Sequence, residues 1–158
     1  MDEETKQEIE RIWKKVTEIE TLIGNKPKIP QNCNTKYSEI ENFCKNIEIS
    51  EEELRNKIDF QDMPRLTFAF KEKSRTKIQF KSLMVLALLC KKIYSKSLTE
   101  GEILKLFKFS KVPSERMDKL YSSTSFKKYF SKTKDQVNCS WAGEKESEKI
   151  IKNLIKNE

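Results

Sequence analysis

The sequence predicts a mainly α-helical protein in which an N-terminal helix and a helical hairpin precede a domain that contains a short β-hairpin. Three observations predict this class. Apolar residues recur every three or four positions over most of the 158-residue chain. Strict alternation of apolar and polar residues, the pattern of a strand, is confined to short runs. Hydrophobic residues make up 36% of the chain, enough at this length to bury a core without metals or disulfides.

Residues 1–25 are expected to form an amphipathic, coiled-coil-like helix. Their apolar residues are spaced three, four, three and four apart, as at the a and d positions of a heptad repeat. These residues are Ile9, Ile12, Val16, Ile19 and Ile23, and Gly24 follows where a C-cap would lie. The pattern favours a homo-oligomer formed through this helix, and the alternative is a helix that packs on its own domain. β-branched residues at both positions leave the subunit number open.

Residues 26–35 contain two prolines and are expected to be a linker. The following segment, 36–75, is expected to hold a helical hairpin and a short extended stretch. Its second helix starts at a capping box that begins with Ser50, and it includes Ile58. After a proline, alternation over 66–70 predicts a strand.

Residues 76–158 are expected to form a domain around one central helix. The stretch Ile78–Tyr94 is apolar around much of its circumference, so this helix should lie in the core. Thr99 and Glu102 occupy capping-box positions and start a second helix.

The rest of this domain predicts a helix, a β-hairpin and a final helix. A third helix is expected to open at Val112–Glu115. Two strands, Phe126–Lys132 and Val137–Trp141, are expected on either side of a polar turn. An amphipathic helix should follow Gly143.

This element order resembles that of winged helix-turn-helix domains, in which three helices, a strand, a turn, a second strand and a helix follow one another. The end of the chain also resembles the YxLTxxGxxxAxxII close of many prokaryotic winged-helix transcription factors. Gly143, Ile150 and Ile151 match this motif outright. Four positions are substituted, with Val137 for Tyr, Cys139 for Leu, Ser140 for Thr and Ser147 for Ala. The resemblance covers about residue 77 to the C-terminus and implies a winged-helix fold that binds DNA.

Charge is divided unevenly along the chain, whose net value is +7. Residues 1–70 carry 11 basic and 15 acidic side chains, whereas residues 71–158 carry 21 basic and 10 acidic ones. A basic half behind an acidic front is typical of a nucleic-acid-binding domain with an assembly arm, although lysine-rich surfaces also arise from genome composition.

The resemblance implies that the third helix and the wing would contact DNA. The outward residues expected on the third helix are Ser114, Arg116, Lys119 and Ser122, and Glu115 and Asp118 oppose their charge. The basic residues expected on the wing are Lys127, Lys128, Lys132 and Lys134. Such a hairpin can follow a phosphate backbone, and the alternative is a solvated lysine face without a ligand.

Composition excludes many catalytic classes. The chain has no histidine, so it holds no Ser-His-Asp or Cys-His relay and no HExxH zinc helix. Its three glycines cannot form a GxGxxG or GxxxxGK phosphate loop. The four cysteines, Cys33, Cys44, Cys90 and Cys139, are widely spaced, as expected for free thiols in a reducing compartment. We therefore expect no enzyme activity, catalytic residue, metal or cofactor.

The sequence thus predicts a DNA-binding protein, a transcriptional or DNA-associated regulator that contacts double-stranded DNA through its third helix and basic wing. The alternative is a protein–protein adaptor that uses the winged-helix fold as a scaffold and assembles through the N-terminal helix. The acidic N-terminus does not resemble a signal peptide, and the longest apolar run is far shorter than a membrane span. A cytoplasmic location without membrane contact is expected.

Overall fold

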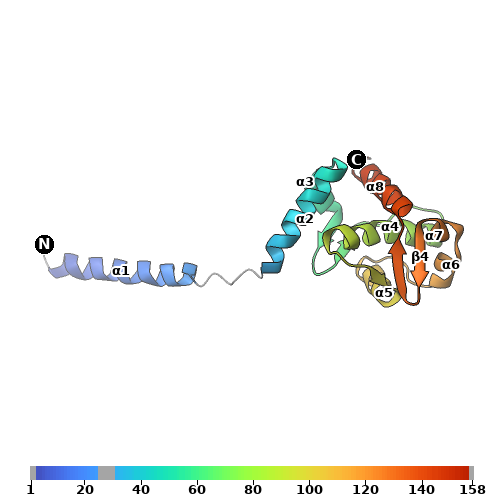
Figure 1. The fold of residues 1–158 in the computed structure, drawn as a ribbon. Coiled ribbons are helices and arrows are strands. Elements are labelled where there is room, and N and C mark those ends of the chain that lie inside the picture. The colour runs from blue at the N-terminus through green and yellow to red at the C-terminus, as the bar shows by residue number, and fades with distance from the viewer. Residues whose placement is uncertain (1–2, 25–30, 157–158) are drawn as a thin grey trace. The chain divides into compact units, whose positions relative to one another are not determined.

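A computed structural model describes the backbone of residues 3–24 and 31–156, and the side chains of residues 5–18 and 36–156 (Figure 1). The chain divides into two compact units, Met1–Thr35 and Lys36–Glu158. The hairpin segment and the C-terminal domain therefore lie in one unit.

The expected N-terminal helix is confirmed as α1, Glu3–Gly24. Its apolar seam is exposed, with 40% of Ile9, 57% of Ile12 and 38% of Val16 accessible, and Trp13 beside the seam is 68% exposed. The side chains of Ile19 and Ile23 lie outside the described residues. Residues 26–30 of the expected linker also lie outside them, and α2 already begins at Gln31.

The expected helical hairpin is formed by α2, Gln31–Ile47, and α3, Glu51–Lys57, and the second unit begins within α2. Ser50 caps α3, because its hydroxyl accepts a hydrogen bond from the backbone N–H of Glu53 at 3.3 Å. Ile40, Phe43 and Leu54 are buried. The hairpin thus contributes to the same core as the rest of the unit.

The extended stretch differs from the prediction. Helix α3 ends before Ile58, which belongs to strand β1, Ile58–Phe60. This strand pairs antiparallel with β2, Pro64–Leu66. The expected strand covered 66–70, but β2 ends at Leu66 and residues 67–70 are not in a strand. Phe68 and Phe70 lie beyond β2 and pack edge to face, with ring centroids 4.9 Å apart. Both rings therefore follow the apolar–polar alternation of the sequence without belonging to a strand.

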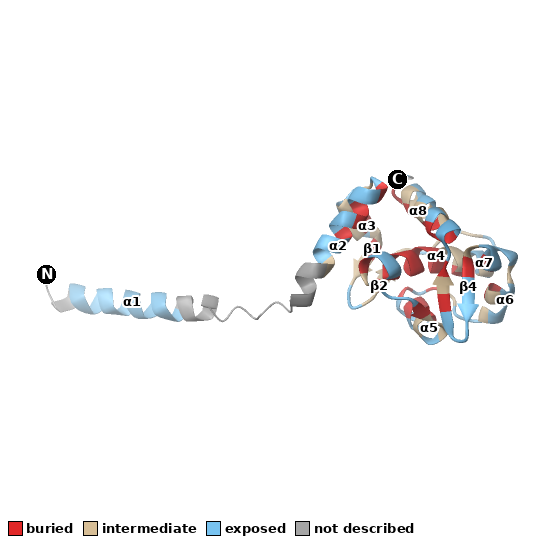
Figure 2. Cartoon of the chain, in the orientation of Figure 1, coloured by how far each residue is buried: buried red, intermediate tan, exposed pale blue. Residues whose placement is uncertain are grey.

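The expected central helix is confirmed as α4, Arg75–Ile93, whose N-cap is Ser74. Every residue from Ser82 to Cys90 is buried, and Figure 2 shows α4 as the red centre of the unit. Helices α5, α6 and α8 and strands β2 and β5 all contact it. An all-round apolar helix needs such cover on every side.

A three-stranded antiparallel sheet covers part of this core. Its strands are β3, Leu98–Thr99, β4, Phe130–Thr133, and β5, Gln136–Cys139. The strand order is β3-β5-β4, so the last strand in sequence lies in the middle. Strand β3 leads directly into α5, Glu100–Phe109, where Thr99 and Glu102 form the predicted capping box.

The region between α5 and β5 differs most from the prediction. The third helix, α6, runs only over Met117–Ser122 and starts later than the expected Val112–Glu115. The strand expected over Phe126–Lys132 is helical in its first part, because α7 spans Thr124–Tyr129. Trp141 is not in a strand but begins α8, Trp141–Lys156, so Gly143 lies inside this last helix.

The cysteines described by the structure, Cys44, Cys90 and Cys139, are free and buried. Burial raises the pKa of the Cys90 thiol to about 12, which keeps it protonated. Within the described residues, no cluster of three potential metal-ligating side chains occurs. None of the described helices is both long and apolar enough to cross a membrane.

Candidate nucleic-acid interface

The predicted contact residues fall into three groups along residues 114–134. Ser114 and Arg116 precede α6 instead of lying on it, and Arg116 has a left-handed backbone with φ 59°. Lys119 and Ser122 lie on α6 and are exposed. The prediction that Lys127 and Lys128 lie on the wing is wrong, because both belong to α7. Lys132 in β4 and Lys134 in the turn after it do belong to the hairpin.

A buried glutamine on α4 positions the loop before α6. The Gln79 side-chain amide donates to the carbonyl oxygens of Pro113 at 2.8 Å and Glu115 at 2.9 Å. These carbonyls precede Arg116, whose left-handed conformation starts α6 without a side-chain cap. Gln79 thus fixes the loop that leads into α6.

Gln79→Met should lower the free energy of unfolding by about 1–2 kcal/mol, because it leaves two partly buried carbonyls without donors while nearly keeping the side-chain volume. Urea denaturation followed by circular dichroism measures this loss. Gln61→Met is the control, since the Gln61 amide bonds only the exposed carboxylate of Asp59. Equal stability of the two variants would contradict the positioning role of Gln79.

Aromatic packing explains why α7 replaces the expected strand. Phe126 packs edge to face on Tyr121 at 5.2 Å and stacks on Phe130 at 5.1 Å between centroids. Residues 126 and 130 are one helical turn apart, so a helix brings both rings to the core. The same turn leaves Lys127 and Lys128 exposed on the outer surface. The Lys128 ammonium lies 5.0 Å from the centre of the Tyr129 ring.

The hairpin turn is tied to the start of α5. Thr133 pairs with Gln136 across the two-residue turn, in which Lys134 has φ 54°. The backbone N–H of Glu100 donates to the carbonyl of Asp135 at 2.9 Å. Lys134 is therefore displayed on a fixed turn. Because Lys128 precedes β4 and Lys134 follows it, the two lie at opposite ends of a strand about 13 Å long.

The Lys132 side chain is exposed, but its ammonium contacts other residues of the protein. Its ammonium lies 2.6 Å from the Glu100 carboxylate and 5.0 Å from the centre of the Tyr121 ring. Burial, and secondarily the Glu100 charge, raises the pKa of Tyr121 to about 12, so this hydroxyl stays neutral. Lys132 is thus less available to a ligand than the sequence predicts.

The other basic side chains of this stretch lack acidic partners. Residues 116–134 are all described and include six basic side chains. Lys132 forms an ion pair, and the other five do not. These five are Arg116, Lys119, Lys127, Lys128 and Lys134. Glu115, whose charge was expected to oppose theirs, instead lies 3.6 Å from Arg75. Of the two acids expected to oppose this positive charge, Glu115 therefore lies near Arg75, whereas Asp118 stays exposed on α6.

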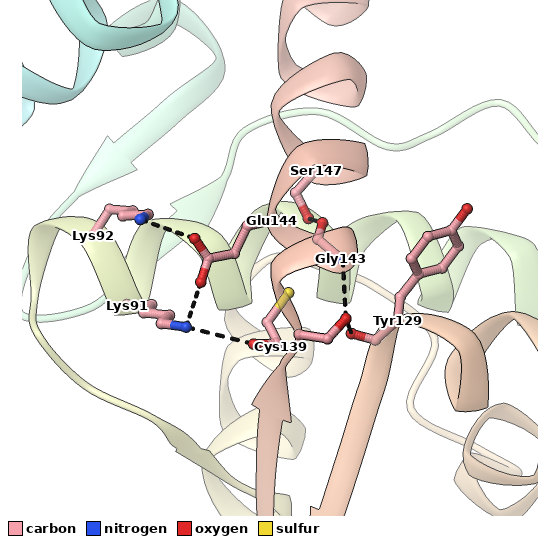
Figure 3. Close-up of polar contacts among 8 residues, drawn as sticks. Lys91, Lys92, Tyr129, Cys139, Gly143, Glu144 and Ser147 are labelled. Carbon is pink, nitrogen blue, oxygen red and sulfur yellow. Dashed lines mark hydrogen bonds and ion pairs between the residues drawn. The ribbon is translucent and has the colours of Figure 1, made fainter.

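The C-terminal motif locks the base of the hairpin onto α7. The Ser140 hydroxyl donates to the Tyr129 carbonyl at 2.9 Å and accepts from the Gly143 N–H at 3.1 Å. A Cβ at Gly143 would lie 2.5 Å from that carbonyl oxygen and 2.7 Å from the Cys139 sulfur. Ser147 is fully buried and donates to the Gly143 carbonyl at 2.8 Å (Figure 3). Ser140, Gly143 and Ser147 thus each have a steric or hydrogen-bonding reason for their place in the motif.

Two lysines of α4 neutralise the acid in the first turn of α8. Lys91 and Lys92 both pair with the Glu144 carboxylate, Lys92 at 2.9 Å, and Lys91 also donates to the Cys139 carbonyl (Figure 3). Burial raises the pKa of Glu144, but the hydrogen bonds from both lysines outweigh it and hold the pKa below its usual value. These two cations are thus paired within the protein.

Sequence reasoning missed Gln79 and Glu100 as residues that shape this surface. A signal for Gln79 existed, since it is a polar residue at a core-facing position of the apolar stretch Ile78–Tyr94. Nothing local marks Glu100 as the partner of Lys132, because their pairing depends on the hairpin folding back onto α5.

Comparisons with family models, curated proteins and solved structures gave no match.

Proposed function

We propose that residues 76–158, within the Lys36–Glu158 unit, form a winged-helix domain that binds double-stranded DNA, chiefly through lysine–phosphate contacts, and that the protein is a non-enzymatic transcriptional or DNA-associated regulator. The fold assignment is supported by the succession of α4, α5, α6, the β4–β5 hairpin and α8. This succession agrees with the three helices, two strands and final helix expected of a winged helix-turn-helix domain, to which β3 and α7 are additions.

The observation that carries DNA binding is the set of unpaired cations on one continuous stretch, with Arg116 and Lys119 around α6, Lys127 and Lys128 on α7 and Lys134 in the hairpin turn. Some lysines on neighbouring elements are paired, such as Lys81 with Glu72 and Lys96 with Glu102, whereas Lys105 and Lys108 on α5 form no ion pair with a described residue. Cations left without partners on helices and a hairpin can neutralise successive phosphates. The six-residue α6 offers few base-reading side chains, so backbone contact dominates.

A salt titration with a fluorescently labelled duplex tests the proposal. About four phosphate contacts predict that the logarithm of the association constant falls with the logarithm of salt concentration at a slope of roughly −4. Absence of binding at about 50 mM salt would overturn it.

A second candidate function, the protein–protein adaptor, is favoured by one exposed aromatic. Phe109 at the end of α5 is 53% exposed, and pockets of about 260 and 220 Å³ border it on either side. The Arg65 guanidinium lies 4.5 Å above its ring. An adaptor would show no DNA affinity at low salt and would co-purify with a stoichiometric protein.

The proposal includes self-association through α1, because Ile9, Ile12 and Val16 form an exposed apolar seam. Two or more DNA-binding units joined in this way would gain affinity through effective concentration.

Ile12→Glu should convert the oligomer to a monomer, since it places a charge in the middle of the seam. Light scattering on the full chain measures the mass. Gln7→Glu, which adds the same charge on the opposite face of α1, should leave the mass unchanged. If Ile12→Glu and the unsubstituted protein contain equal numbers of subunits, α1 is not the assembly element.

A further inference from the structure

A pocket of about 410 Å³ lies away from the basic stretch, within the Lys36–Glu158 unit. Its walls come from the end of α3, the segment after β2, and helices α4 and α8. This volume falls within the range of sites for small organic ligands. Four separate elements form it, so the pocket exists only in the folded unit.

The inner wall of the pocket is apolar. Phe68 and Phe70 contribute a pair of rings held edge to face at 4.9 Å, and Ile150 and Leu154 contribute two side chains from successive turns of α8. All four are only partly buried, and Phe68, Phe70 and Ile150 also pack against the core, so the wall retains apolar surface that lines the pocket. Covering such a surface with an apolar group is favourable by about 25 cal/mol per Å².

The rim of the pocket is cationic. Its lining includes three lysines, Lys57, Lys71 and Lys81, and no acidic residue. The Lys81 ammonium is already used, because it donates to the Glu72 carboxylate and lowers the pKa of that group. Lys71 is exposed and forms no ion pair with any described residue. The exposed side-chain amide of Asn153 adds a hydrogen-bond donor to the lining.

We propose that this pocket binds a small amphipathic carboxylate, with its apolar body against Phe68, Phe70 and Leu154 and its carboxylate at Lys71. A single unpaired cation matches a single negative charge, and the apolar wall excludes a strongly hydrated polyanion such as a nucleotide. The site is independent of the DNA interface, because none of its lining residues belongs to the 114–134 stretch.

Calorimetric titration of the full-length protein with decanoate, without DNA, tests the site. Decanol and decyltrimethylammonium have the same chain length without the negative charge. We expect saturable binding of one decanoate per chain and much weaker binding of the other two. Absence of saturable decanoate binding, or decanol binding as tight as decanoate binding, would overturn the proposal.

Two substitutions locate the ligand. Lys71→Glu should weaken decanoate binding about tenfold or more, since it removes a charged hydrogen bond and adds repulsion. Lys73→Glu makes the same change at an exposed lysine outside the pocket and should bind as the unsubstituted protein does. Ala69→Phe should block binding by filling the pocket, and circular dichroism checks that each variant is folded. Unchanged binding by both Lys71→Glu and Ala69→Phe would place decanoate elsewhere.

Discussion

Gly143→Ala is expected to lower the free energy of unfolding by about 2–3 kcal/mol, a cost typical of overpacking a well-filled site. The added methyl would meet the Tyr129 carbonyl oxygen at 2.5 Å and the Cys139 sulfur at 2.7 Å. Neither neighbour can withdraw easily. The Tyr129 carbonyl accepts hydrogen bonds from both the hydroxyl and the backbone N–H of Ser140. The sulfur belongs to Cys139, a residue of the central strand β5.

Gly101→Ala is the matched control, because a Cβ there meets no atom within 4 Å. Gly101 lies in the first turn of α5 and is exposed, so the same substitution should raise stability by up to about 1 kcal/mol through helix propensity. Thermal denaturation of both variants measures the difference, and Gly143→Ala should lower Tm by roughly 5–10 °C. If the two variants changed stability in the same direction, the close approach of α8 to α7 would not be what requires glycine at 143.

Elements defined by local chemistry could be predicted from the sequence. The capping box of Thr99 and Glu102 and the all-round apolar character of α4 depend on residues within a few positions of one another, and both are confirmed. The end of β5 was predicted to within two residues and the start of the last helix to within three. The physical basis of the C-terminal motif, the hydrogen bonds of Ser140 to the Tyr129 carbonyl, could not be predicted, because it links two segments 11 residues apart.

Elements with two compatible patterns were predicted wrongly. Phe126 and Phe130 are four residues apart, a spacing that turns both inward in a strand as well as in a helix. Packing on Tyr121 favours the helix, and this contact is not visible in a local pattern. The three-residue strand β1 was missed for a related reason, since Ile58 continues the helical spacing from Leu54.

The candidate interface was predicted in composition but not in arrangement. The excess of lysine over 114–134 is a property of the sequence, whereas the pairing of Lys132 with Glu100 joins residues 32 positions apart. Lys132 is therefore no longer an expected DNA contact, and Lys127 and Lys128 lie on α7 instead of on the wing. A test of DNA binding should accordingly alter the unpaired lysines and leave Lys132 unchanged.

Reversing four of the unpaired lysines should therefore abolish DNA binding. In the variant that combines Lys119→Glu, Lys127→Glu, Lys128→Glu and Lys134→Glu, each substitution removes one phosphate contact and adds repulsion. At about 0.1 M salt each lost contact weakens binding about tenfold, so the four together should weaken it at least about 10³-fold. All four side chains are exposed, so the fold should be retained.

The matched control reverses four lysines outside the stretch that form no ion pair with a described residue, Lys105 and Lys108 on α5 and Lys152 and Lys156 on α8. Both variants change the net charge by the same amount, so a general attraction between a basic protein and DNA would weaken equally in the two. A located interface predicts that the control keeps most of the affinity and its salt dependence, whereas the first variant loses both. Anisotropy titrations at several salt concentrations measure affinity and slope together. Equal losses in the two variants would mean that the lysines on α6, α7 and the hairpin form a solvated face and that the phosphate contacts lie elsewhere.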